Sequence, residues 1–143
     1  MKKLFYNIYS NISEKQFFKV DKKLNVVQYR MSKILYPDGW QKEPQTDGLG
    51  VGFRKKTAKI FGSIGITFDD QPGKLTFSLG ILKYFDENNV RYSLRQYIFE
   101  NEEFDYFEDK TEDFITLALT KYHTWSREDI INLGEKDQLT SYK

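Results

Sequence analysis

The residues best suited to covalent or metal chemistry are few in this chain. His123 is the only histidine, and there is no cysteine. A metal site would need carboxylates for nearly all of its ligands, and a nucleophilic Ser–His pair would depend on this one ring. His123 lies just past a predicted helix, where the negative end of the helix dipole favours a cation. We interpret it as a surface or capping histidine and predict no catalytic residue, no metal and no cofactor.

Two short motifs resemble catalytic or phosphate-binding patterns without meeting their requirements. A glycine-rich run at 48–52 precedes Lys55, but a phosphate loop needs glycine where Lys55 stands when the motif is counted from Gly50. Asp69 and Asp70 are adjacent, whereas glycosidic hydrolysis needs two carboxylates that face each other across a cleft. We therefore interpret the first as a flexible entry to a strand and the second as part of a turn.

The most unusual stretch runs from Glu100 to Asp113, where eight acids alternate with aromatic residues and there is one lysine. Like charges repel along a helix, and a cationic partner would relieve that repulsion. A solvated helix surface is the alternative interpretation. The candidate partner-binding residues are Glu102, Glu103, Phe104, Asp105, Tyr106, Phe107, Glu108 and Asp109.

A second candidate surface combines cations with aromatic rings, as single-stranded nucleic-acid platforms do. Its residues come from a basic segment and from the outward positions of a later strand. Phe99 is among those outward positions, and Tyr84 could join them. No RNA-recognition signature accompanies them. The candidate nucleic-acid-binding residues are Arg54, Lys55, Lys56, Lys59, Arg91, Arg95 and Tyr97.

These side chains would be positioned by a meander of three strands between Gly62 and Glu100. Apolar residues recur at every second position in three successive runs, for example at Ile64, Ile66 and Phe68 in the first run and at Leu79 in the second. The runs are separated by turn-forming residues at 69–73 and 86–89. The sequence therefore predicts antiparallel neighbours with one dry face.

The flanking segments predict helices at both ends. Apolar spacing indicates a helix over about 2–15, followed by strands at 17–20, 24–36 and 51–61, with a long loop at 40–50 and a tight connection at Gly62. After the meander, one helix over about 102–122 or a shorter helix capped by Thr111 is consistent with the pattern. Ser126 and Asp129 predict a capping pair for a last helix that Gly134 ends, and 135–143 reads as a frayed tail.

This order predicts an α+β fold: an antiparallel meander of about four to six strands, with an N-terminal helix and one or two C-terminal helices packed on one face. The chain of 143 residues has the length of a single domain, 1–143. Aromatic residues make up 17% of it, so much of the core must consist of Phe and Tyr. The helices should cover the apolar face of the sheet, and the other face is left to water or a partner.

Charge and targeting signals bound the possible functions. Residues 1–60 carry 13 Lys or Arg and 5 Asp or Glu, whereas residues 61–143 carry 9 and 16. We expect no membrane partner, because no apolar run is long enough to span a bilayer or to form a signal peptide, and we expect a cytoplasmic protein. The character of the chain suggests a small bacterial inhibitor of the toxin-immunity type that docks its acidic and aromatic surface on a basic protein, such as a toxin or nuclease. Single-stranded nucleic-acid binding is the alternative.

Overall fold

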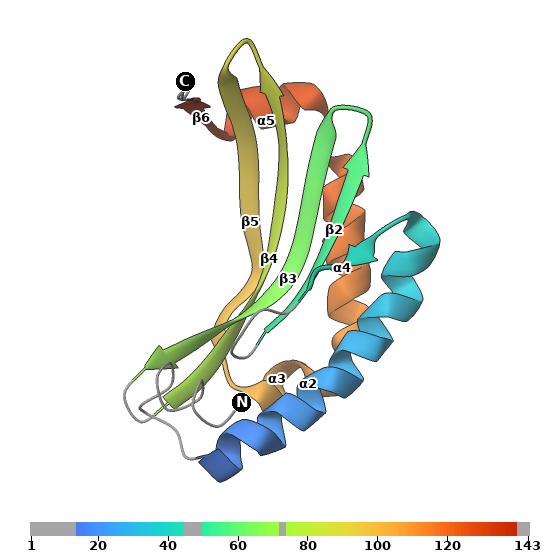
Figure 1. Cartoon of the computed structure of the whole chain (residues 1–143), viewed down its shortest axis with the longest axis vertical. Coiled ribbons are helices and arrows are strands. Elements are labelled where there is room, and N and C mark those ends of the chain that lie inside the picture. Colours follow the sequence, from blue (N-terminus) through green and yellow to red (C-terminus); the bar gives the residue numbers. More distant parts are fainter. Residues whose placement is uncertain (1–13, 45–49, 72–73, 140–143) are drawn as a thin grey trace.

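The computed structural model describes residues 14–44, 50–71 and 74–139 (Figure 1). An N-terminal helix is followed by an antiparallel sheet and by C-terminal helices, which is the predicted α+β class. The elements are α2 (Glu14–Leu35), the 3-10 turn η1 (Tyr36–Asp38), β1 (Gln41–Lys42), β2 (Gly50–Thr57), β3 (Ile60–Gln71), β4 (Lys74–Glu87), β5 (Val90–Glu102), α3 (Phe104–Glu108), α4 (Thr111–Thr124), α5 (Arg127–Leu133) and β6 (Glu135–Gln138).

Six strands form one sheet in the order β1-β2-β3-β4-β5-β6, with each strand antiparallel to the next. The predicted alternation is confirmed, because Ile64, Ile66 and Leu79 are all buried on one face. The predicted turn between β4 and β5 is also confirmed. Asn88 and Asn89 have φ values of 54° and 62°, the left-handed conformation that a two-residue hairpin turn requires.

The helices cover one face of this sheet, which Figure 1 shows as strongly curved with α2 and α4 on the same side. Along α2 the buried residues recur every three or four positions and so form one stripe: Phe17, Val20, Leu24, Val27, Met31 and Leu35. Along α4 the buried residues are Thr111, Ile115, Ala118 and Tyr122. The hydrophobic core lies between these two stripes and the inner face of the sheet.

Helix α2 corrects two sequence predictions. The strands expected at 17–20 and 24–36 are parts of this single helix. The adjacent pair Val26 and Val27 fits no alternation, but in the helix Val27 is buried and Val26 is 58% exposed. The helix predicted over 2–15 lies outside the described residues except at its last two positions.

The connection between β2 and β3 also differs from the prediction. The turn is at Ala58 and Lys59, where Ala58 has a φ of 50°, and Gly62 lies inside β3. A Cβ added to Gly62 would lie 2.5 Å from the Tyr122 ring, so this glycine makes room for α4 instead of turning the chain. The long loop expected at 40–50 contains the short strand β1, and its residues 45–49 lie outside the described part.

The C-terminal third follows the shorter of the two helical alternatives. Two helices, α3 and α4, replace one long helix, and α4 begins at Thr111. Thr111 does not cap α4, because its hydroxyl donates to the carbonyls of Phe107 and Glu108 at the end of α3. The Ser126 and Asp129 capping box is present, and α5 ends before Gly134. The predicted frayed tail is wrong at Glu135–Gln138, which pair with β5 as strand β6.

Strand β5 changes the face that its residues present. Gly80 pairs with Tyr97 but Leu79 pairs with Phe99, so Ile98 is an extra residue in the ladder and forms a bulge. Tyr97 therefore points away from the helices, whereas Phe99 points into the core and is 7% exposed. The expectation that Phe99 shares the outward face with Tyr97 is wrong for this reason.

Candidate functional site

Helix α3 divides its aromatic residues between the core and the surface. Phe104 and Phe107 are three positions apart, so they share one face of the helix. Both are buried, and both contact Phe77 with ring centroids 5.7 Å away. These two rings fix α3 to the sheet, and their burial corrects the expectation that they would be contacts for a partner.

Tyr106 lies on the other side of α3 and is 46% exposed. Its ring is supported by Phe99 and Phe114, with centroids 5.6 Å and 5.5 Å away. Because Phe99 also stacks on Phe107 at 5.0 Å, the exposed tyrosine stands on a fixed aromatic base. It is the one ring of the predicted set that a partner could contact.

The carboxylates around α3 fall into two groups. Two of them are bound by helix α2: Lys23 Nζ lies 3.5 Å from Glu108 Oε1, and Arg30 Nε donates to Glu112 Oε2 at 2.7 Å. Arg30 also donates to the carbonyl oxygen of Glu108 at 2.6 Å. The hydrogen bond from Arg30 lowers the pKa of Glu112 below its usual value.

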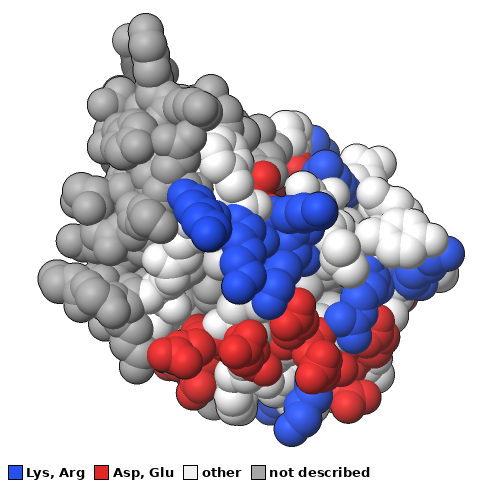
Figure 2. Space-filling model, turned by 90° about the horizontal axis from the view of Figure 1, so that it is seen from below, with Lys and Arg blue, Asp and Glu red and all other residues white. Residues whose placement is uncertain are grey.

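The other carboxylates make no ion pair with any described residue. With Tyr106 they form a surface that we call the acidic end: Glu102, Glu103, Asp105, Tyr106 and Asp109. Figure 2 shows a band of Asp and Glu beside a band of Lys and Arg at the lower end of the molecule. On this side of the molecule, opposite charges therefore lie in two neighbouring bands.

The second surface is the side of the sheet opposite the helices, which we call the open face. Its outward residues from β2 to β5 form successive rows across the strands. One row contains Lys56, Phe61 and Tyr84, in which the two rings stack at 5.0 Å and 11°. Lys56 lies over Phe61 at 5.3 Å, and Arg91 lies over Tyr84 at 4.4 Å. Cations therefore flank both rings of this stack.

The rows beside this stack contain Arg54, Ser63, Leu82 and Arg95, and then Gly65, Gly80 and Tyr97. Small residues on the central strands leave the surface hollow. Leu82 lines three adjoining hollows with volumes of about 720, 190 and 390 Å³. The largest is bounded by the stacked rings and by Arg54, and the smallest by Arg95 and Tyr97.

The structure brings together five of the seven predicted nucleic-acid-binding residues on this face: Arg54, Lys56, Arg91, Arg95 and Tyr97. The other two differ. Lys55 also lines the largest hollow, but its Nζ lies 3.0 Å from Asp38 Oδ2 on the helix side, and Lys59 lies in the turn after β2. Phe61 was not predicted for this site because the turn was expected at Gly62. Alternation of Phe61, Ser63 and Gly65 through that position is the signal that could have found it.

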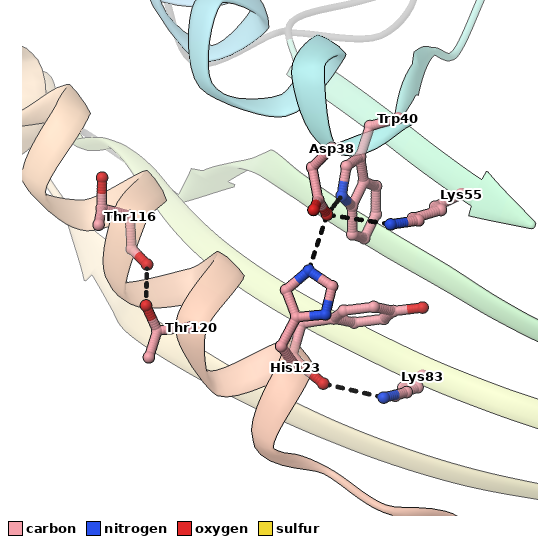
Figure 3. Close-up of polar contacts among 8 residues, drawn as sticks. Asp38, Trp40, Lys55, Lys83, Thr116, Thr120 and His123 are labelled. Carbon is pink, nitrogen blue, oxygen red and sulfur yellow. Dashed lines mark hydrogen bonds and ion pairs between the residues drawn. The ribbon is translucent and has the colours of Figure 1, made fainter. Parts of the chain in front are cut away.

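A third polar cluster lies on the helix side of the sheet (Figure 3). Asp38 Oδ2 accepts from Trp40 Nε1 at 2.9 Å and lies 2.7 Å from His123 Nε2. Burial raises the pKa of Asp38, but the hydrogen bonds of His123, Lys55 and Trp40 outweigh it, and the pKa is lowered overall. No hydroxyl group of the described residues hydrogen-bonds His123. The cluster lacks a nucleophile and instead joins η1, β2 and α4.

Lys83 lies near this cluster and is 8% exposed. Its ammonium donates to the carbonyls of Tyr122 and Trp125 at the end of α4, at 3.0 and 2.6 Å, and lies over the Tyr122 ring. Burial lowers the pKa of Lys83, and the positive charge of Lys55 adds to this effect. The lysine therefore stabilises the C-terminal end of the helix against the sheet.

No model of a known protein family matches this chain, and no curated protein or solved structure is significantly similar to it. Within 14–44, 50–71 and 74–139, no cluster of three or more His, Cys, Asp or Glu residues could hold a metal ion. None of the helices in those ranges combines the length and apolar character needed to cross a membrane.

Proposed function

We propose that this chain is a small bacterial binding protein without catalytic activity that inhibits a basic protein in the cytoplasm, as immunity proteins do with their toxins. The acidic end is the docking surface. The observation that carries this proposal is an exposed tyrosine on a fixed aromatic base, surrounded by Glu102, Glu103, Asp105 and Asp109, which pair with no described cation.

The mechanism has two stages. The carboxylates attract a cationic surface at long range and raise the association rate at low salt. Tyr106 then becomes buried in the interface. Tyrosine is enriched among the residues that dominate binding energy, and its rigid ring loses little conformational entropy. Because Phe104 and Phe107 already hold α3 on the sheet, docking needs no reorganisation of this helix.

Affinity capture from the native host tests this proposal, with the full chain as bait at low and moderate salt. We expect a basic protein to be retained by the wild type and lost with the double variant Glu103→Lys/Asp105→Lys. The matched control is Glu135→Lys/Asp137→Lys, which makes the same charge change on the exposed strand β6 at the other end of the molecule. Release by both double variants, or by neither, would contradict docking through the acidic end.

The product of the neighbouring gene provides a direct test of inhibition. If that protein is basic and enzymatic, the wild-type chain should block its activity, and Tyr106→Ala should weaken inhibition by roughly tenfold to a hundredfold. Circular dichroism would verify that the variant remains folded. Full inhibition by a folded Tyr106→Ala variant would remove the tyrosine from the proposed interface.

A further inference from the structure

The open face carries a surplus of positive charge that the described residues do not neutralise. Arg54, Lys56 and Arg95 make no ion pair with any of them. Arg91 is different, because Asp86 accepts from its Nε and Nη2 at 2.7 and 2.9 Å. Three cations that have no ion pair within the described part of the chain therefore border the hollows around Leu82, and an anionic ligand would be attracted there.

The aromatic rings of the open face lie at two places that are separated along the strands. Phe61 and Tyr84 form a stack at one end of the face, and Tyr97 lies four residues along the strands, a separation of about 13 Å. The Tyr97 ring lies over Gly80, whose added Cβ would be 3.4 Å from it, and is 40% exposed. A ligand that contacts both ends must be extended and must offer a flat group to Tyr97.

The border at β6 limits the ligand further. Glu135 and Asp137 line the hollow that Arg91 and Arg95 share, so negative charge replaces positive charge at this edge. Glu43, which follows β1, also lines the largest hollow. A polyanion is therefore favoured over β2 to β5 and disfavoured over β6 and beside β1. The carboxylates of an acidic peptide could pair with the cations, but they provide no planar group to stack on Tyr97.

From this combination we propose that the open face binds single-stranded nucleic acid. Arg54, Lys56 and Arg95 contact phosphates, and Tyr97 provides a surface on which a base stacks. The stacked pair Phe61 and Tyr84 forms the wall at the other end of the site. Because stacking rings accept every base, binding is expected to show little sequence preference. This site is separate from the acidic end, and its test does not depend on the proposed protein partner.

Fluorescence anisotropy with a labelled oligothymidylate of about 12 nucleotides tests the proposal on the full chain. Three phosphate contacts predict a slope of about −2 in log affinity against log salt, or roughly a 20-fold loss of affinity between about 50 and about 200 mM salt. The duplex form of the same length should bind more weakly, because its bases cannot reach Tyr97. A flat salt titration, or no binding at low salt, would overturn the proposal.

Two substitutions separate phosphate contact from base stacking. Arg95→Gln should reduce the salt slope by about 0.7. Tyr97→Leu should weaken binding about tenfold and leave the slope unchanged. The matched control for charge is Lys19→Gln, an exposed lysine on α2 on the opposite side of the sheet. The proposal fails if Lys19→Gln weakens binding as much as Arg95→Gln does.

Polyglutamate distinguishes nucleic acid from a general polyanion. It carries repeated negative charge but no flat groups, so it should compete poorly with the oligonucleotide. If polyglutamate binds as tightly and Tyr97→Leu has no effect on either ligand, the face is a site for acidic polypeptides and the nucleic-acid assignment is wrong.

Discussion

At the scale of single residues, Arg30 contributes to stability by joining α2 to the end of α3 and the start of α4. Its guanidinium binds the carboxylate of Glu112 and the carbonyl oxygen of Glu108. These contacts link residues that are about eighty positions apart in the sequence. The charge pattern predicted an acidic stretch at this place but could not show that α2 supplies its counter-charge, because 24–36 was interpreted as a strand.

Substitution of Arg30 tests this link. Arg30→Gln should lower the free energy of unfolding by about 1–2 kcal/mol, because charged hydrogen bonds to Glu112 and Glu108 are lost. Urea denaturation measures the change. Lys22→Gln is the control, since Lys22 is an exposed cation of the same helix with no ion pair to a described residue. Equal stability of the Arg30 variant and the wild type would show that the pair is a negligible surface contact.

The Asp38 cluster predicts part of the acid sensitivity of the fold. The pKa of Asp38 lies below the ordinary aspartate value of 3.8. The carboxylate therefore stabilises the folded state fully above pH 3.8, and this contribution is lost as the pH falls through the lower folded-state pKa. Asp38→Asn should be less stable than the wild type at pH 6, and the difference should narrow below about pH 3.5.

Thermal unfolding across this pH range measures the Asp38 effect. Asp86→Asn is a useful comparison, because the pKa of Asp86 is also lowered, by hydrogen bonding to Arg91 on the opposite face. A stability difference for Asp38→Asn that stays constant from pH 6 to below pH 3.5 would contradict a role of its charge.

At the scale of elements, the long meander strands were predictable because period-two alternation fixes both strand type and inward face. The sequence predicted Ile64, Ile66 and Leu79 for the dry face, and all three are buried. Helix α2 is harder to predict, because adjacent apolar pairs such as Phe17–Phe18 and Val26–Val27 obscure its stripe. The buried residues from Phe17 to Leu35 recur every three or four positions, which is the helical spacing.

The packing of α4 on β3 makes a specific prediction at Gly62. Gly62→Ala would place a Cβ 2.5–2.7 Å from the Tyr122 ring, which is fixed between Trp40 and the sheet. We expect a loss of about 2–3 kcal/mol in unfolding free energy from overpacking. The matched control is Gly80→Ala on the neighbouring strand, where the new Cβ would be 3.4 Å from Tyr97.

Chemical denaturation of both glycine variants gives the comparison. Gly80→Ala lies in ordinary contact with a half-exposed ring that can move, so its cost should be well below that of Gly62→Ala. If the two costs were equal, the loss would reflect strand glycines in general and not the fit of Tyr122 on β3.

At the scale of the whole molecule, the two candidate surfaces differed in how far the sequence could predict them. Residues of the acidic end are contiguous, so composition alone located them. Which of their rings are exposed depends on how α3 packs, and composition could not separate Tyr106 from Phe104. The open face is assembled from four strands, and its prediction needed the register of β2 against β3, which was misplaced at Gly62.

The edge strand β6 is expected to limit self-association by covering part of β5. The long strands β3, β4 and β5 lie in the middle of the sheet, between the shorter strands β1 and β2 on one side and β6 on the other. Strand β6 has four residues and forms one edge. A chain ending at Gly134 would expose the hydrogen-bonding edge of β5, because β6 pairs with Val90 to Ser93. Sedimentation velocity should show increasing self-association of this shortened chain with concentration, beyond that of the full chain. Identical sedimentation of both chains would contradict a protective role of β6.

The bulge at Ile98 affects both surfaces, because Tyr97 belongs to the open face and Phe99 supports Tyr106 of the acidic end. In a regular strand residues 97 and 99 would lie on the same face, so without the bulge either a phenol would enter the core or a phenylalanine would lie among the arginines. Hairpin turns elsewhere can gain or lose residues at little cost. Relatives of this chain that keep both surfaces should therefore vary freely in their turns while β5 keeps Tyr97 and Phe99 on opposite faces.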